Sequence, residues 1–198
     1  MKLLSTALVA AGLLAVALPS QAATFHFTGN ITYHNDVITI PFTLDADATD
    51  VRVYTDSFLS SLNFDPITAL WGGDGTRLAQ NDDNANINPS VQTWYDSGFY
   101  LPTLAAGDYF FTVATYNNWA VGTNISAGFI FDNQTPILLS DWNQPASHYN
   151  MGSQWSVWLE GVSSATNPNP PGAAVPEPSL LALLGLGLMG LGASRLRK

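Results

Sequence analysis

The sequence predicts an all-β protein, a jelly-roll-like β-sandwich of about eight strands placed between two apolar chain ends. In the middle of the chain, short runs alternate between apolar and polar residues, and segments rich in glycine and asparagine separate them. No run there has the three-to-four-residue spacing of an amphipathic helix. We therefore expect an N-terminal signal helix, a sandwich, and a C-terminal hydrophobic helix.

Residues 1–22 have the composition of a signal peptide. Lys2 precedes an apolar run over 3–18, and small residues lead up to Ala22 as at a cleavage site. The run is shorter than the roughly 20 apolar residues that a spanning helix needs. We therefore expect signal peptidase to cleave the chain, so that the mature protein starts near Ala23.

The sandwich domain is expected over 23–162. Its clearest alternating runs are 38–44, 51–55, 109–113 and 155–159. Pro41 cannot donate a ladder hydrogen bond, which predicts an edge strand or a bulge. The glycine-rich run 72–75 predicts a hairpin turn. His26 and His34 flank an expected first strand, and we expect both to be exposed.

A linker is expected over 163–174, a stretch rich in proline, asparagine and serine. The charge of the domain and this linker limits the partners that they can bind. Fourteen of the 15 acidic residues, but only Arg52 and Arg77 of the 6 basic residues, lie between the chain ends. Nucleic acid and anionic lipid are therefore excluded as partners, while divalent cations and neutral sugars remain. Since the chain has no cysteine, thiol catalysis and thiolate zinc sites are also excluded.

The segment 175–198 has three parts: a Pro-Glu-Pro motif, an apolar run over 180–193, and a basic end. Its marked residues are Pro176, Glu177, Pro178, Arg195, Arg197 and Lys198. As a helix, the stretch 179–194 would be about 24 Å long against a hydrocarbon core of about 30 Å. The basic side chains would reach the cytoplasmic interface and act as a membrane stop.

This segment resembles the PEP-CTERM sorting signal of exported bacterial proteins. The resemblance implies recognition by an exosortase, which would remove the hydrophobic tail near the Pro-Glu-Pro motif. It also implies transient insertion in the inner membrane of an exopolysaccharide-producing bacterium. The final location would be the cell surface or the extracellular matrix.

The body resembles the bacterial pre-peptidase C-terminal domain over about residues 25–131. Asp65 stands before a glycine hairpin that leads to the run 81–83, Asn-Asp-Asp, and the run 107–109 fits the domain's Gly-x-Tyr strand. The resemblance implies a jelly-roll sandwich of about eight strands. Some domains of this family bind calcium.

Five residues at the two ends of that hairpin offer the hard oxygen ligands that calcium prefers. They are Asp65, Asp74, Asp82, Asp83 and Asn84. An EF-hand loop is excluded because Ile87 stands where that loop needs glycine. The other interpretation is that these side chains cap turns by hydrogen bonding to the backbone.

Trp119 and Trp142 lie beside amide residues, as in a sugar-binding loop, although packing inside the fold explains large aromatic residues equally well. The sequence has no Gly-x-Ser-x-Gly elbow and no histidine pair with metal-ligand spacing. We predict a non-catalytic, exported surface or matrix protein. The alternatives are a carbohydrate-binding module for exopolysaccharide and, after it, a hydrolase.

Overall fold

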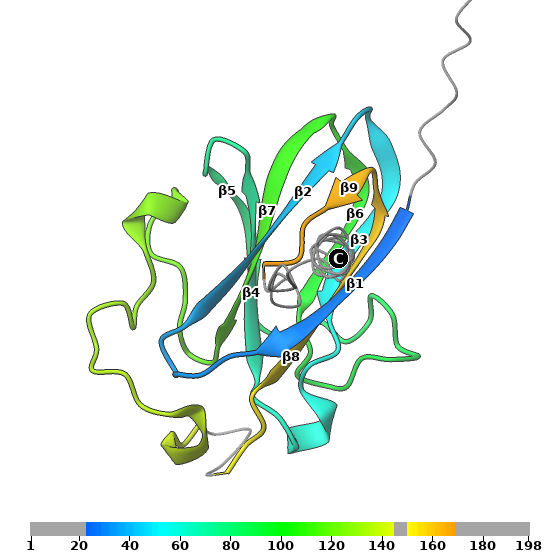
Figure 1. Ribbon diagram of the computed structural model, residues 1–198. Helices are drawn as coiled ribbons and strands as arrows, with labels where there is room; N and C mark the ends of the chain where they lie inside the picture. Colours follow the sequence, from blue (N-terminus) through cyan, green and yellow to red (C-terminus); the bar gives the residue numbers. More distant parts are fainter. Residues whose placement is uncertain (1–22, 145–149, 169–198) are drawn as a thin grey trace, which may run out of the picture.

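The computed structural model describes residues 23–144 and 150–168. The described chain folds into two antiparallel sheets that face each other (Figure 1). The 4-stranded sheet has the order β1-β8-β3-β6 and consists of β1 (Ala23–Asn30), β8 (Gln154–Val162), β3 (Ala48–Thr55) and β6 (Gly98–Leu104). The 5-stranded sheet has the order β5-β4-β7-β2-β9 and consists of β5 (Arg77–Asn81), β4 (Pro66–Gly72), β7 (Gly107–Thr115), β2 (Val37–Leu44) and β9 (Ser164–Ala165).

The prediction of an all-β sandwich is confirmed. The four alternating runs lie within β2, β3, β7 and β8, and the glycine-rich run joins β4 to β5. The helical elements of the described chain are short 3-10 turns: η1 (Leu59–Ser61), η2 (Ile125–Ala127) and η3 (Leu139–Asp141). The expected signal helix and C-terminal helix lie outside the described residues. Within the described ranges, no helix is both long enough and apolar enough to cross a membrane.

The core lies between the two sheets and explains the alternation along the strands. The 4-stranded sheet supplies Val53, Trp155, Val157 and Leu159, and the 5-stranded sheet supplies Ile40, Phe42, Phe111 and Val113. All are buried. Burial of one such side chain contributes about 1.5–3 kcal/mol, so this one layer of residues holds the sheets together.

Strand β4 departs from the alternating pattern because both of its faces are covered. Its side chains from Pro66 to Trp71 are all buried. One face meets the core through Leu70. On the other face, Ala69 and Trp71 pack with Ala120, Phe110, Ile125 and Phe129. The strand therefore lacks the alternation of buried and exposed residues, and its polar residue Thr68 is also buried, with its hydroxyl hydrogen-bonded to that of Ser97.

Pro41 lies in β2, which is the second strand from the edge and pairs with β7 without a bulge, so the expectation of an edge strand or a bulge is wrong. The N–H of Thr166 donates to the Pro41 carbonyl oxygen over 3.0 Å, so this backbone face points toward β9 and away from β7. The missing proline donor therefore interrupts no bond to β7.

Strand β9 makes the sandwich nine-stranded, against the expected eight. It lies at the start of the expected linker 163–174, where Ser164 pairs with Thr43. The sandwich therefore extends past residue 162, because these residues satisfy backbone groups that β2 would otherwise leave unpaired at its edge.

Candidate functional site

The β4–β5 hairpin brings three of the predicted calcium ligands together. Thr68 pairs with Asn81 across the hairpin, so the residues before β4 and those after β5 meet at the same end of the sheet. Asp65 stands just before β4, and Asp82 and Asp83 directly follow β5. One carboxylate oxygen of each aspartate lies within 4.8 Å of the others. We call Asp65, Asp82 and Asp83 the carboxylate cluster.

The backbone of Asp65 is held by hydrogen bonds at both ends, while its carboxylate has no donor among the described residues. Its N–H donates to Gln144 Oε1 over 2.8 Å, and its carbonyl oxygen accepts from the N–H of Tyr116 over 2.8 Å. The residue is only 4 % exposed, yet its Oδ1 has no hydrogen-bond partner among the described residues. The buried Oδ1 of Asp82 has none there either. Buried carboxylate oxygens without partners are costly, so the cluster is suited to a bound cation.

The electrostatics of the carboxylate cluster point the same way. Burial first, and then the nearby charges of Asp82, Asp83 and Asp96, raise the pKa of Asp65 to about 8. Burial, followed by the charge of Asp83, raises the pKa of Asp82 to about 6. Burial also raises the pKa of Asp83. A divalent cation would favour the ionised form of all three groups.

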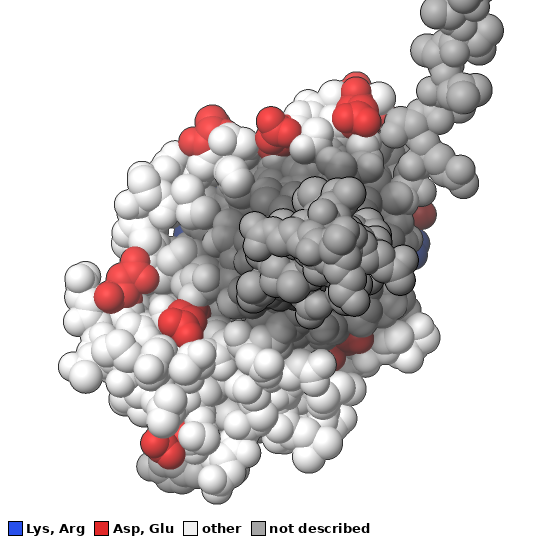
Figure 2. Space-filling model, viewed as in Figure 1, with Lys and Arg blue, Asp and Glu red and all other residues white. Residues whose placement is uncertain are grey.

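The two arginines of the described chain are engaged elsewhere. Arg52 forms ion pairs with Asp50 and Glu160, and Arg77 donates to Gln80 and to the carbonyl oxygen of Ala120. The acidic side chains visible in Figure 2 are spread around the molecule, not gathered in one patch. The convergence of the three aspartates, and not the overall charge, therefore marks the site.

Asp74, another predicted ligand, lies at the opposite end of the hairpin. It is exposed in the turn between β4 and β5, where Oδ1 accepts from the Thr76 N–H over 2.9 Å and Oδ2 accepts from the Thr76 hydroxyl over 3.0 Å. These hydrogen bonds lower its pKa. Asn84 follows the cluster, and its side-chain oxygen accepts from the Asn86 N–H over 3.4 Å. The structure thus brings together Asp65, Asp82 and Asp83 and places Asp74 apart from them.

Asp96 lies close enough to the carboxylate cluster for its charge to affect Asp65, but it was not among the residues predicted from the sequence. It is fully buried. Its Oδ1 accepts from Thr55 Oγ1 and the Phe58 N–H, and its Oδ2 accepts from the N–H and hydroxyl of Thr93. The Thr93-x-x-Asp96 spacing could have indicated a local turn. Its nearness to Asp65 depends on tertiary structure, because 30 residues of two strands and a loop separate the two.

The two tryptophans considered for sugar binding are half-buried. The Trp142 ring lies 5.3 Å from that of His34 and 5.8 Å from that of Phe131, between centroids. The expectation that His34 is exposed is wrong: it is buried, because its Nε2 pairs with Gln134 over 3.0 Å inside this aromatic group. No ring contact links Trp119 to another aromatic residue of the described chain.

The amides beside these tryptophans serve the loops. Asn118 Oδ1 accepts from the Phe131 N–H over 2.9 Å, and Gln144 connects Asp65 to the carbonyl oxygen of Tyr116. The most exposed tryptophan is Trp94, at 57 %. Sequence reasoning did not distinguish it, because exposure depends on which loop covers which ring.

Comparison with known proteins identifies the C-terminal segment. Residues 174–198 match the model of the PEP-CTERM protein-sorting motif. The match includes Pro176–Pro178 and the basic residues at the end of the chain, all of which lie outside the described residues. No curated protein matches the chain. The predicted PEP-CTERM motif is therefore confirmed, and it implies an exported, surface-sorted protein that an exosortase processes.

Proposed function

We propose that this is a non-catalytic surface or extracellular-matrix protein whose sandwich binds a calcium ion through Asp65, Asp82 and Asp83. The observation that carries the proposal is the convergence of three carboxylates, two of which have a buried oxygen without a partner among the described residues. Asp65 is fixed at both of its backbone groups, so the site is preorganised for a ligand.

Calcium is the cation that fits this donor set. The cluster offers only carboxylate oxygens, which are hard ligands, and calcium accepts six to eight of them in irregular geometry. Magnesium needs near-ideal octahedral geometry, while zinc and copper sites favour nitrogen or sulfur ligands. Exported calcium modules typically bind with dissociation constants of about 10⁻⁴–10⁻³ M. The cluster contains no nucleophile and base pair, which supports a structural role for the ion.

The rest of the proposal concerns processing and fold. Signal peptidase would expose Ala23, and an exosortase would then cut near Pro176–Pro178 and release the body from its transient membrane tether. The strand order β1-β8-β3-β6 against β5-β4-β7-β2 supports a jelly-roll arrangement of the sandwich. That order also supports the resemblance to the pre-peptidase C-terminal domain.

Calorimetric titration tests the calcium site. The full chain, stripped with chelator and kept in a zwitterionic detergent, should bind calcium at a single saturable site and bind magnesium more weakly. Asp83→Ala should weaken binding about tenfold or more, because it removes a charged ligand. Asp74→Asn, which removes a charge at the other end of the hairpin, should leave the affinity unchanged. No saturable binding at millimolar calcium would overturn the site.

Mass spectrometry of the protein recovered from the surface of its host tests the sorting proposal. The expected C-terminus lies near Pro176–Pro178, because exosortase cleavage would remove the apolar run and the basic end. Recovery of surface protein that still carries Lys198 would contradict the proposal.

A further inference from the structure

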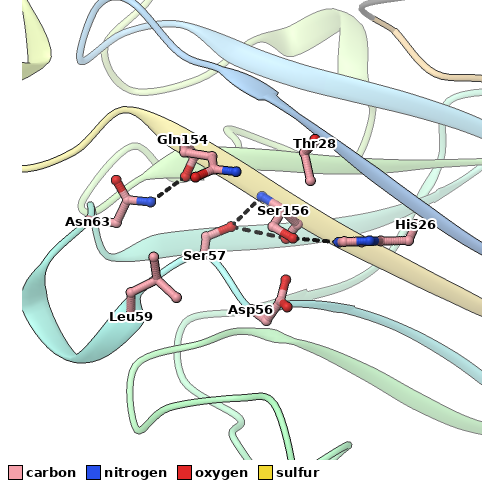
Figure 3. Close-up of a pocket in the computed structure, with 8 residues that line it drawn as sticks. All are labelled: His26, Thr28, Asp56, Ser57, Leu59, Asn63, Gln154 and Ser156. Carbon is pink, nitrogen blue, oxygen red and sulfur yellow. Dashed lines mark hydrogen bonds between the residues drawn. The ribbon is translucent and has the colours of Figure 1, made fainter.

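A polar pocket of about 240 Å³ lies on the 4-stranded sheet, apart from the carboxylate cluster (Figure 3). Its walls come from three distant parts of the chain: His26 and Thr28 on β1, Asp56 and Leu59 around the start of η1, and Gln154 on β8. We call it the β1–β8 pocket. Nothing in the sequence motifs distinguishes it.

The floor of the β1–β8 pocket is rigid. The N–H of Ser156 donates to Ser57 Oγ over 2.9 Å, and the Ser57 hydroxyl donates back to the Ser156 carbonyl oxygen over 3.0 Å (Figure 3). Ser156 Oγ lies 2.8 Å from His26 Nε2. The His26 ring stacks on its cross-strand partner Trp158, with centroids 3.9 Å apart and an 8° interplanar angle. A ligand would therefore meet a surface that needs no reorganisation.

Above this floor, several polar groups have no partner in the described chain. The Asp56 carboxylate accepts no hydrogen bond there, and its Oδ1 is fully buried. Neither the Thr28 hydroxyl nor the Gln154 side-chain amide forms a hydrogen bond with the described residues. In Figure 3, Asp56 and Thr28 lie on opposite sides of Ser156. A buried carboxylate oxygen without a donor indicates that a ligand completes the group.

A strained turn brings an apolar side chain to this pocket. Leu59, Ser60 and Ser61 have φ values of 49°, 55° and 77°, so three successive non-glycine residues are left-handed. This conformation is unfavourable for residues with a side chain, and such residues cluster at active sites and ligand clamps. Asn63 Nδ2 ties the turn to the Gln154 carbonyl oxygen over 2.6 Å. The result is that Leu59, 44 % exposed, lines the pocket and is not turned into the core.

We propose that the β1–β8 pocket binds a neutral, hydroxyl-rich ligand, one residue of a polysaccharide chain. A sugar hydroxyl can both donate and accept a hydrogen bond, so it can donate one to the Asp56 carboxylate and accept one from the Thr28 hydroxyl or the Gln154 amide. An ammonium group only donates, and the Asp56 carboxylate repels a phosphate. Leu59 offers an apolar contact for the C–H face of a sugar ring. The pocket volume suits a single ring, and the proposal does not depend on the calcium site.

The Ser156–His26 pair positions the ligand and is not a nucleophile and base. In a serine nucleophile pair, a third group orients the histidine. Here the only hydrogen bond that the His26 ring makes within the described residues is the one to Ser156. His26 instead rests on Trp158, which keeps its ring parallel to the sheet surface.

The test is binding of methyl glycosides of glucose, galactose and mannose to the full chain. The protein is kept in a zwitterionic detergent, since sugar-based detergents would compete, and in chelator, which removes any contribution of a cation. Saturation-transfer NMR detects binding, and tryptophan fluorescence follows Trp158 beneath His26. At least one glycoside should bind with a millimolar dissociation constant, and methylammonium and inorganic phosphate should not.

Asp56→Asn should weaken this binding about tenfold or more, because it exchanges a charged acceptor for a neutral amide. Gln154→Ala should weaken it severalfold. Asp45→Asn removes the same charge from an exposed position outside the pocket and should have no effect. The melting temperature of Asp56→Asn should equal that of the wild type, because the carboxylate makes no hydrogen bond that the variant would lose.

Three results would overturn the proposal. The first is that no glycoside binds, and the second is that Asp56→Asn leaves binding unchanged while Trp119→Ala or Trp142→Ala abolishes it. The third is cleavage of an oligosaccharide that Ser156→Ala abolishes, since this would show catalysis at the pocket.

Discussion

Replacing Asp65 by asparagine should stabilise the protein in chelator and make its stability insensitive to calcium. The amide keeps the shape of the side chain and stays neutral where the buried carboxyl group has to ionise. It can also donate to the carboxylates of Asp82 and Asp83. In the wild type, burial first, and then neighbouring acidic groups, raise the Asp65 pKa from 3.8 to about 8. Ionisation of this residue therefore opposes folding, and this penalty grows as the pH rises from about 4 to about 8.

The magnitude follows from that shift. One pKa unit corresponds to about 1.4 kcal/mol, so the whole shift of the Asp65 pKa would correspond to at most about 6 kcal/mol of stability. Because the neighbouring carboxylates relax together, we expect Asp65→Asn to raise the free energy of unfolding by about 2–4 kcal/mol in chelator at pH 8. In a domain of this size the melting temperature would rise by roughly 4–16 °C.

Calcium should stabilise the wild type but not Asp65→Asn. With a dissociation constant of about 10⁻⁴ M, about 5 mM calcium would stabilise the wild type by about 2 kcal/mol, or roughly 4–8 °C. Asp65→Asn should show no such shift. Differential scanning calorimetry of the full chain in detergent, with calcium or chelator, measures both effects, and Asp74→Asn is the control that should keep the calcium shift. An equal calcium shift in wild type and Asp65→Asn would contradict a role for the Asp65 carboxylate as a calcium ligand.

Three further predictions concern stability. In chelator, the free energy of unfolding should fall as pH rises from about 4 to about 8, because the unfolded chain loses protons that the buried carboxylates retain; urea midpoints that rise over this window would contradict it. Gly98→Ala should cost about 3 kcal/mol or more, because the added methyl group meets the backbone of β3, whereas Gly107→Ala, with nearly the same φ (152° against 149°) and only an ordinary van der Waals contact with the Tyr109 ring, should cost about 1 kcal/mol. Equal costs by chemical denaturation would show that φ alone matters. Asp96→Ala should cost about 3 kcal/mol, because the N–H groups of Phe58 and Thr93 lose their acceptors; an unchanged urea midpoint would contradict this.

Strands with one buried face could be predicted from the sequence because their residues alternate between apolar and polar. Strands buried on both faces, or paired through only two residues, could not. Strand β8 alternates because Trp155, Val157 and Leu159 face the core while Trp158 faces outward. Strand β4 is buried on both faces, so it carries no period of two. Strand β9 pairs only two residues, and its sequence resembles the linker that follows it.

The candidate sites show the same division. Sequence spacing placed acidic residues at both ends of one hairpin, and strand pairing decided that Asp82 joins Asp65 while Asp74 lies at the far end. The β1–β8 pocket was unpredictable, since His26, Asp56 and Gln154 come from three segments that only the sheet brings together.

The sorting of this protein and its all-β class could be predicted from the amino-acid sequence. A sorting motif is read as a linear segment, and the period of two follows from the geometry of a single strand, so neither needs a tertiary structure. Which carboxylate oxygens converge, which of them have no hydrogen-bond partner in the described chain, and which side chains line a pocket became visible only in the folded structure. Those properties depend on strand register and on the burial of groups from distant segments, and a chain read in order contains neither.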